Sequence, residues 1–167
     1  EIGIDRMLEY YHRKGYSDNW INQRLKSIEV RKELTDEWER RGVRKGQEFA
    51  VLTDIVTQGW SGMTTREYKR YKGLKTESLR DNMTNLELVL NMLAEASTTE
   101  ISKEKKPCTV AQNRKVATEG GSVAAAARKT LEARTGKKVV SRLNARRILA
   151  GKALEELEAP ETEKTEE

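Results

Sequence analysis

One histidine and one cysteine, His12 and Cys108, are the side chains best suited to nucleophilic or general-base catalysis. No Ser, Cys or Asp stands at a recognised motif spacing from His12, so the pattern of a catalytic triad is absent. Lys105 and Lys106 could activate the Cys108 thiol through their charge, but a single cysteine in a polar segment is typical of a thiol without a role. One histidine and one cysteine also cannot form a zinc cluster. We therefore predict no catalytic residue, no metal site and no cofactor.

Asp36, Glu37 and Glu39 form an acidic cluster that could imitate a magnesium site. Metal-dependent nucleases, however, gather carboxylates from separate elements around one open position. Acids in a first turn and arginines in a last turn are the arrangement that the helix dipole favours. This pattern predicts a short helix from Thr35 to Gly42. A metal-dependent nuclease-like enzyme is kept as the enzymatic alternative.

The triplet Gly120-Gly121-Ser122 could receive a phosphate on free backbone amides at a helix start. It lacks the Gly-x-x-x-x-Gly-Lys-Ser/Thr spacing of a nucleotide-binding loop. A hinge or helix cap is the simpler interpretation. The alanine-rich stretch that follows predicts a helix that ends at Gly136, with a narrow apolar face made by Val123, Ala127 and Leu131.

Positive charge is concentrated in one segment. Residues 1–102 contain 17 basic and 17 acidic residues, residues 103–152 contain 14 and 3, and residues 153–167 contain 1 and 7. The aromatic residues (three Trp, five Tyr and one Phe) all lie at or before Tyr71. We therefore predict a helical core domain at 1–102, an extended basic helical arm at 103–152 and an acidic tail at 153–167, of which residues 160–167 are expected to be disordered.

The basic arm is the main candidate for binding, because clustered cations can neutralise the phosphates of a nucleic acid or contact an acidic partner. The competing interpretation is a solvated face that the acidic tail balances. Tryptophans 20, 38 and 60 could be base-stacking platforms, but they lie in or near apolar helix faces and are predicted to pack in the core. The candidate contact residues are Arg128, Lys129, Arg134, Lys137, Lys138, Arg142, Arg146 and Arg147.

Helical spacing and capping residues predict an all-α, multi-helix bundle. The first helix ends at Gly15, and Ser17 caps a second one, which has an apolar stripe. The segment from Phe49 to Gly59 favours a helix, with a short strand over 49–52 as the alternative. Beyond Gly136, residues 137–144 are expected to be extended around two valines, and 146–157 to form a further helix.

Thr64 with Glu67, and Thr84 with Glu87, match the capping box and predict two more helix starts. The helix after Thr84 is rich in apolar residues, and we expect it to be central and to mediate self-association. Its polar run, residues 97–99, suggests hydrogen bonds between subunits.

Several blocks of the sequence are similar to one family. They are Gly15–Ile28, Arg31–Trp38, Lys72–Lys75, Leu79–Thr84, Ala94–Ile101, Gly120–Gly121, Ala127–Arg128 and Thr135–Lys137. Together they resemble the region downstream of the Bro-N domain in bacterial prophage antirepressor-like proteins, often labelled DNA damage-inducible protein D. The resemblance implies a role in phage regulation and the DNA damage response, and it supplies no catalytic residues. The Bro-N domain that typically opens this family has no counterpart in the chain.

These observations lead to one function hypothesis and two alternatives. The first is a non-enzymatic regulatory module that self-associates and contacts DNA backbone or a regulatory protein. The alternatives are a purely structural oligomerisation region and the nuclease-like enzyme. The start of the chain has no signal-peptide pattern, and no window has the roughly 20 apolar residues of a membrane span, so we expect a cytoplasmic protein that does not enter a membrane.

Overall fold

The computed structural model describes residues 2–150, and within that range every regular element is a helix. The elements are α1 (Ile2–Lys14), α2 (Asp18–Arg40), α3 (Gln47–Ser61), α4 (Thr65–Tyr71), the 3-10 helix η1 (Arg80–Asn82), α5 (Asn85–Lys105) and α6 (Val110–Thr135). Residues 145–150 are also helical. The predicted all-α multi-helix bundle is confirmed, and the alternative strand at 49–52 is wrong. The remainder of the helix predicted at 146–157 and the acidic tail lie outside the described residues.

Side-chain caps begin four of the helices. The hydroxyls of Ser17, Thr64, Thr84 and Thr109 each accept a hydrogen bond from the backbone N–H three residues later. At Thr84 the capping box is complete, because the Glu87 carboxylate also accepts from the Thr84 N–H. The helix starts predicted after Thr64 and Thr84 are therefore confirmed.

The helix start predicted at Thr35 is wrong, because α2 continues through this position without a break. The Thr35 hydroxyl donates back to the carbonyl of Lys32 at 3.0 Å and caps nothing. Trp38, one turn later, is 1% exposed, and its burial holds this part of α2 in the helix. Tertiary packing thus overrides a local start signal.

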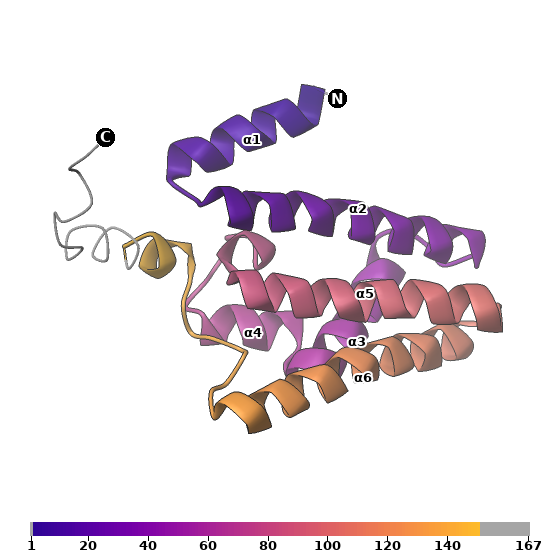
Figure 1. The fold of residues 1–167 in the computed structure, drawn as a ribbon. Helices are drawn as coiled ribbons and strands as arrows, with labels where there is room; N and C mark the ends of the chain where they lie inside the picture. Colours follow the sequence, from indigo (N-terminus) through magenta and orange to yellow (C-terminus); the bar gives the residue numbers. More distant parts are fainter. Residues whose placement is uncertain (1, 151–167) are drawn as a thin grey trace, which may run out of the picture.

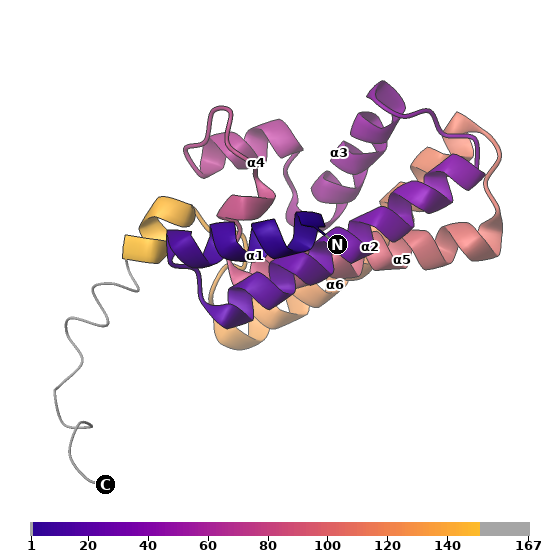
Figure 2. The ribbon, with the colours of Figure 1, turned by 90° about the horizontal axis from the view of Figure 1, so that it is seen from above.

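Helix α5 lies at the centre of the bundle, between α2 on one side and α6 on the other (Figure 1). Helix α3 packs against both α5 and α6, and α1 packs on α2. Figure 2 shows α3 and α4 on the same side of α2. The 3-10 helix and α4 occupy the end of the bundle at which α6 finishes (Figure 1).

Aromatic side chains make up much of the core. Trp20, Trp38 and Trp60 are at most 4% exposed, so the core-packing prediction for them is confirmed. Trp20 stacks on Tyr16 with ring centroids 3.9 Å apart, and its indole N–H donates to the Met83 carbonyl at 2.9 Å. These contacts join the start of α2 to the segment before α5.

Helix α6 crosses both α3 and α5 at unusually short distance. A Cβ placed on Gly121 would lie 2.9 Å from Cα of Gly59 in α3, and one on Gly120 would lie 2.7 Å from Cα of Thr98 in α5. The predicted cap or hinge at Gly120–Ser122 is therefore wrong: these residues lie inside α6, where the absence of a side chain lets the backbones approach.

The basic region is part of the bundle over much of its length. The predicted boundary between residues 102 and 103 falls inside α5, and α6 packs against α3 and α5. The predicted apolar face of α6 is right only in part. Ala127 and Leu131 are half-buried and pack against the core, but Val123 is 43% exposed. The fully buried hydrophobic positions of α6 are Val116, Ala117, Ala124 and Ala125. Alanine and glycine make this close contact because their small size brings whole backbones together.

Candidate functional site

The predicted cations lie on the last turns of α6 and on the segment that follows it, which runs along the end of the bundle (Figure 1). Seven of the eight are exposed, and within residues 2–150 none of the seven has an ion-pair partner. Their charge is therefore available to an anionic partner. We call these seven residues the basic end: Lys129, Arg134, Lys137, Lys138, Arg142, Arg146 and Arg147.

Arg128 is the predicted contact residue that the structure places elsewhere. Its Nε donates to the carbonyl of Trp60 at 2.7 Å, and its Nη1 pairs with Glu132 at 2.6 Å. Only 17% of the side chain is exposed. Its charge is already matched, and it fastens the end of α3 to α6 rather than facing a partner.

The segment after α6 is held by buried contacts. Gly136 ends α6 in the left-handed conformation, and Val139 and Val140 are 5% and 7% exposed, so the expected extended segment is anchored in the core. The carbonyl of Leu143 accepts from Lys72 Nζ at 2.6 Å. The Asn144 amide group donates to the Lys72 carbonyl at 3.0 Å. These contacts therefore fix the backbone that carries much of the basic end to the bundle.

Lys72, which makes these contacts, belongs to a buried ion pair. Lys72 Nζ lies 2.7 Å from Oε1 of Glu87, and both side chains have no exposed surface. Tyr68 donates its hydroxyl to the same carboxylate, and the Thr84 backbone N–H donates to Oε1 at 3.1 Å. Burial lowers the pKa of Lys72 and raises the pKa of Glu87, because both charged forms lose contact with water. The direct contact and the added hydrogen bonds oppose these shifts.

Arg142 adds an aromatic contact at the same place. Its guanidinium carbon lies 4.7 Å from the centroid of the Tyr71 ring, at the end of α4. Such a contact holds the stem of the arginine while leaving its nitrogens accessible. The exposed position of Arg142 is thereby linked to α4 as well as to α6.

Sequence reasoning did not find the buried polar stripe along α5. Its members recur at spacings of three and four residues and lie inside the bundle, while Leu86, Val89 and Leu93 are 37–42% exposed. The polar spacing itself was the available signal, but the apolar residues masked it. The stripe consists of Glu87, Asn91, Glu95, Thr98 and Ser102.

Each member of the polar stripe has a partner within the chain. Asn91 accepts from the indole N–H of Trp60 at 3.1 Å, and Glu95 pairs with Arg80. The hydroxyl of Thr98 donates to the carbonyl of Ala94 at 2.8 Å. Thr98 and Thr99 are buried in the bundle, so the suggested hydrogen bonds between subunits at residues 97–99 are not supported: both hydroxyls bond within α5.

The acidic cluster in α2 is structural. Glu37 is fully buried, and its carboxylate accepts from Arg41 at 2.6 Å and from the Ser102 hydroxyl at 3.0 Å. Burial raises the pKa of Glu37, but the hydrogen bonds from Arg41, Ser102 and Arg40 lower it by a larger amount. The net shift of the pKa is therefore downward. The cluster lies near the end of α2, which contradicts the first-turn explanation. Among the described residues, no group of three His, Cys, Asp or Glu side chains could hold a metal ion.

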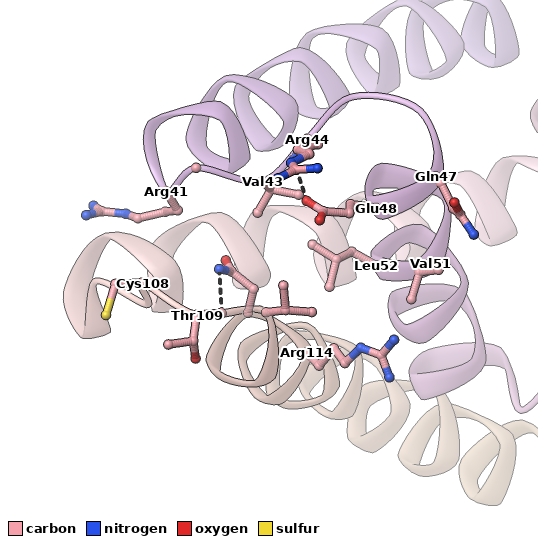
Figure 3. Close-up of a pocket in the computed structure, with 13 residues that line it drawn as sticks. Arg41, Val43, Arg44, Gln47, Glu48, Val51, Leu52, Cys108, Thr109 and Arg114 are labelled. Carbon is pink, nitrogen blue, oxygen red and sulfur yellow. Dashed lines mark hydrogen bonds between the residues drawn. The ribbon is translucent and has the colours of Figure 1, made fainter.

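His12 and Cys108 lie at the surface. His12 Nδ1 is 3.6 Å from Asp18, and Cys108 Sγ lies 3.3 Å from the side-chain oxygen of Gln112. Cys108 borders a cavity of about 470 Å³ between the α2–α3 loop and the start of α6 (Figure 3). Figure 3 shows Arg41 and Arg114 directed away from one another, so its cations do not converge on one point.

The fold and the charged end define this chain as an all-α domain with an exposed cationic surface built on a buried polar framework. Comparison with known families places it further: the profile of the DinD C-terminal domain matches residues 17–142. The chain therefore belongs to the DinD C-terminal domain family, and the resemblance to DNA damage-inducible protein D is confirmed. No curated protein and no solved structure matches the chain. None of the described helices is long and apolar enough to cross a membrane.

Proposed function

We propose that this domain is a non-enzymatic regulatory module of the DNA damage response, and that its basic end contacts the phosphate backbone of DNA. One observation carries the proposal: seven exposed cations without an ion-pair partner in residues 2–150 lie on a segment that buried contacts hold in place. A preorganised cationic surface loses little conformational freedom on binding.

Backbone contact is favoured over base recognition. The basic end consists of exposed lysines and arginines, and the Tyr71 ring lies under Arg142, where it is not open to a base. Binding of this kind has little sequence preference and weakens steeply as salt rises. An acidic regulatory protein is the second candidate partner, because a surface of free cations also fits clustered carboxylates.

A salt titration with short duplexes of unrelated sequence tests the proposal. We compare the wild-type chain with the variant K137Q/K138Q/R142Q and with a control, K26Q/K103Q/K115Q, which loses the same three charges from other exposed positions. Each lost phosphate contact lowers the slope of log affinity against log salt by about 0.9. We expect a decrease of roughly two to three in the first variant and little in the control. Equal slopes, or no binding at low salt, would contradict DNA contact by the basic end.

Self-association is the second part of the proposal. Leu86, Val89 and Leu93 form an exposed row at spacings of three and four residues on α5. Such a row favours pairing with another apolar face. We expect Leu93→Glu to lower the solution mass measured by analytical ultracentrifugation, whereas Val110→Glu, an equally apolar exposed site on α6, leaves it unchanged. A monomeric wild-type chain would remove this part of the proposal.

The proposal assigns no reaction to the domain. The nuclease alternative predicts cleavage of duplex DNA in magnesium that stops when a chelator is added. Duplex that stays intact in magnesium, at protein concentrations that saturate binding, supports the regulatory proposal. Chelator-sensitive cleavage would replace it with the enzymatic one.

A further inference from the structure

A second group of cations lies beyond the basic end, in an open cleft of about 640 Å³ between α2, α3 and α4. Its cationic side chains have no ion-pair partner among residues 2–150, and Asp54 is the single carboxylate in the lining. Asp54 is engaged in the fold, since it accepts from the Thr65 N–H at 3.2 Å. The four cations are Arg31, Arg66, Lys69 and Lys75.

Arg31 is the fixed member of this group. Its Nη2 donates to the Thr53 hydroxyl at 2.7 Å, and its guanidinium carbon lies 5.2 Å from the ring centroid of Trp38. Burial lowers its pKa, because the charged form is partly removed from water. Arg66, Lys69 and Lys75 line the same cleft.

The charges near Arg31 are unevenly matched. In the described part of the chain, buried nitrogens of Arg31 and Arg80 have no hydrogen-bond partner, and neither does the second oxygen of Glu95. Glu95 pairs with Arg80, and its charge also acts on Arg31, so two guanidiniums share one carboxylate. An anion in the cleft would add a second negative charge near Arg31.

We propose that this cleft binds a phosphate group. Three properties favour phosphate: a net charge of about +3 in the lining, one oriented guanidinium and three flexible cations around it. The phosphate could belong to a DNA backbone or to a free nucleotide, since the two share this chemistry.

Helix α4 connects the cleft to the basic end. Arg66 and Lys69 on α4 line the cleft, while Tyr71 at its end lies under Arg142. Seven helical residues extend about 10 Å, which equals the rise along the duplex axis of roughly three phosphates of one strand. A backbone that lies on the basic end can therefore continue into the cleft. If the phosphate belongs to DNA backbone, the inference extends the proposed function and rests on it.

The test uses the full chain, the cleft variant R66Q/K69Q and the control K26Q/K115Q, which loses the same charge elsewhere. One arm measures the thermal midpoint with added inorganic pyrophosphate, and the other measures the salt dependence of duplex binding. A midpoint that pyrophosphate raises in wild type and control, but not in R66Q/K69Q, supports the cleft, and it indicates a free nucleotide when the duplex-binding slope of R66Q/K69Q is unchanged. A duplex-binding slope reduced by about two only in R66Q/K69Q supports the cleft and indicates DNA backbone.

The proposal is overturned if R66Q/K69Q and K26Q/K115Q behave alike in both arms. The experiment tests the cleft independently of the proposed function of the basic end. If K137Q/K138Q/R142Q binds duplex as the wild type does while R66Q/K69Q loses binding, the proposed function of the basic end fails and the cleft stands. Loss in K137Q/K138Q/R142Q alone, with pyrophosphate without effect, retains the basic end and removes the cleft.

Discussion

Lys72 and Glu87 form a fully buried ion pair, 2.7 Å apart, that joins the segment after α4 to the first turn of α5. The same Lys72 ammonium also holds the carbonyl of Leu143. One buried cation thus couples the core to the segment that carries the basic end. Removing either charge leaves the other without its counterion in a region without water contact.

We expect Lys72→Met to lower the free energy of unfolding by about 3–5 kcal/mol, the usual cost of orphaning a buried charge. Urea unfolding followed by circular dichroism measures the loss. Lys75→Met, an exposed lysine three residues later, is the control and should change stability by less than about 0.5 kcal/mol. The double variant K72M/E87L should recover part of the loss, because no charge remains buried. Equal stability of the two single variants would show that the pair contributes nothing.

Substitution of Gly120 by alanine is expected to destabilise the bundle by about 1–3 kcal/mol or more. The added Cβ would lie 1.9 Å from Oγ1 and 2.7 Å from Cα of Thr98, so α5 and α6 must separate. Gly3→Ala is the matched control, since it also lies in a helix and nothing stands within 4 Å of its added Cβ. Thermal unfolding of both variants measures the difference. A Gly120→Ala variant as stable as the wild type would contradict the close approach of the two helices.

Arg128 and Lys129 are neighbours with opposite expected behaviour. Arg128→Gln should cost about 1.5–3 kcal/mol of stability, because its charged hydrogen bonds to Trp60 and Glu132 are lost. Lys129→Gln should leave stability within about 0.5 kcal/mol but lower the salt slope of duplex binding by about one. Urea unfolding and fluorescence anisotropy measure the two quantities. The reverse pattern would mean that Arg128, and not Lys129, faces the partner.

The free energy of unfolding should fall in alkaline solution, because two buried tyrosines keep their protons in the folded chain after they have lost them in the unfolded chain. Burial raises the pKa of Tyr16 to about 12, and burial together with the hydrogen bond to Asp81 raises the pKa of Tyr11 further. In the unfolded chain these hydroxyls ionise near about pH 10. Between about pH 10 and 12 the folded chain therefore retains protons that the unfolded chain has released. The free energy of unfolding therefore decreases as pH rises through this window.

Urea unfolding at a series of pH values tests this dependence. Tyr16→Phe should flatten the alkaline decrease, whereas Tyr10→Phe, which changes a ring that is 51% exposed, should leave it as steep as in the wild type. If Tyr16→Phe has the same alkaline slope as the wild type, burial of the Tyr16 hydroxyl does not govern the effect.

The helical class, several helix ends and the family were predictable from local sequence signals. A capping residue such as Thr84 binds amides only two or three positions away, so its effect can be predicted from nearby residues in the sequence. The aromatic core was predictable as well, because large apolar rings such as Trp60 bury themselves in any compact fold. The cations of the basic end could be found by composition, since most lysines and arginines remain exposed.

Other features depended on residues distant in sequence. The single helix α2 and the uninterrupted α6 contain residues that locally signal a helix boundary, Thr35 and Gly120–Gly121, and only their packing partners made helix the lower-energy state there. Arg128 could not be separated from Lys129 by sequence, because its partner Trp60 lies 68 residues earlier.

The sequence by itself determined that the chain is helical, where several helices begin and where positive charge accumulates, because helix propensity, capping and charge are properties of short segments. Only the tertiary structure decided which polar groups are buried and which cations of the described residues remain exposed. Lys72 and Leu143 meet across 71 residues, and Ser102 and Glu37 across 65. The stability of a buried polar group depends on the partner that the fold brings to it, and that partner is not specified by its neighbours in the chain.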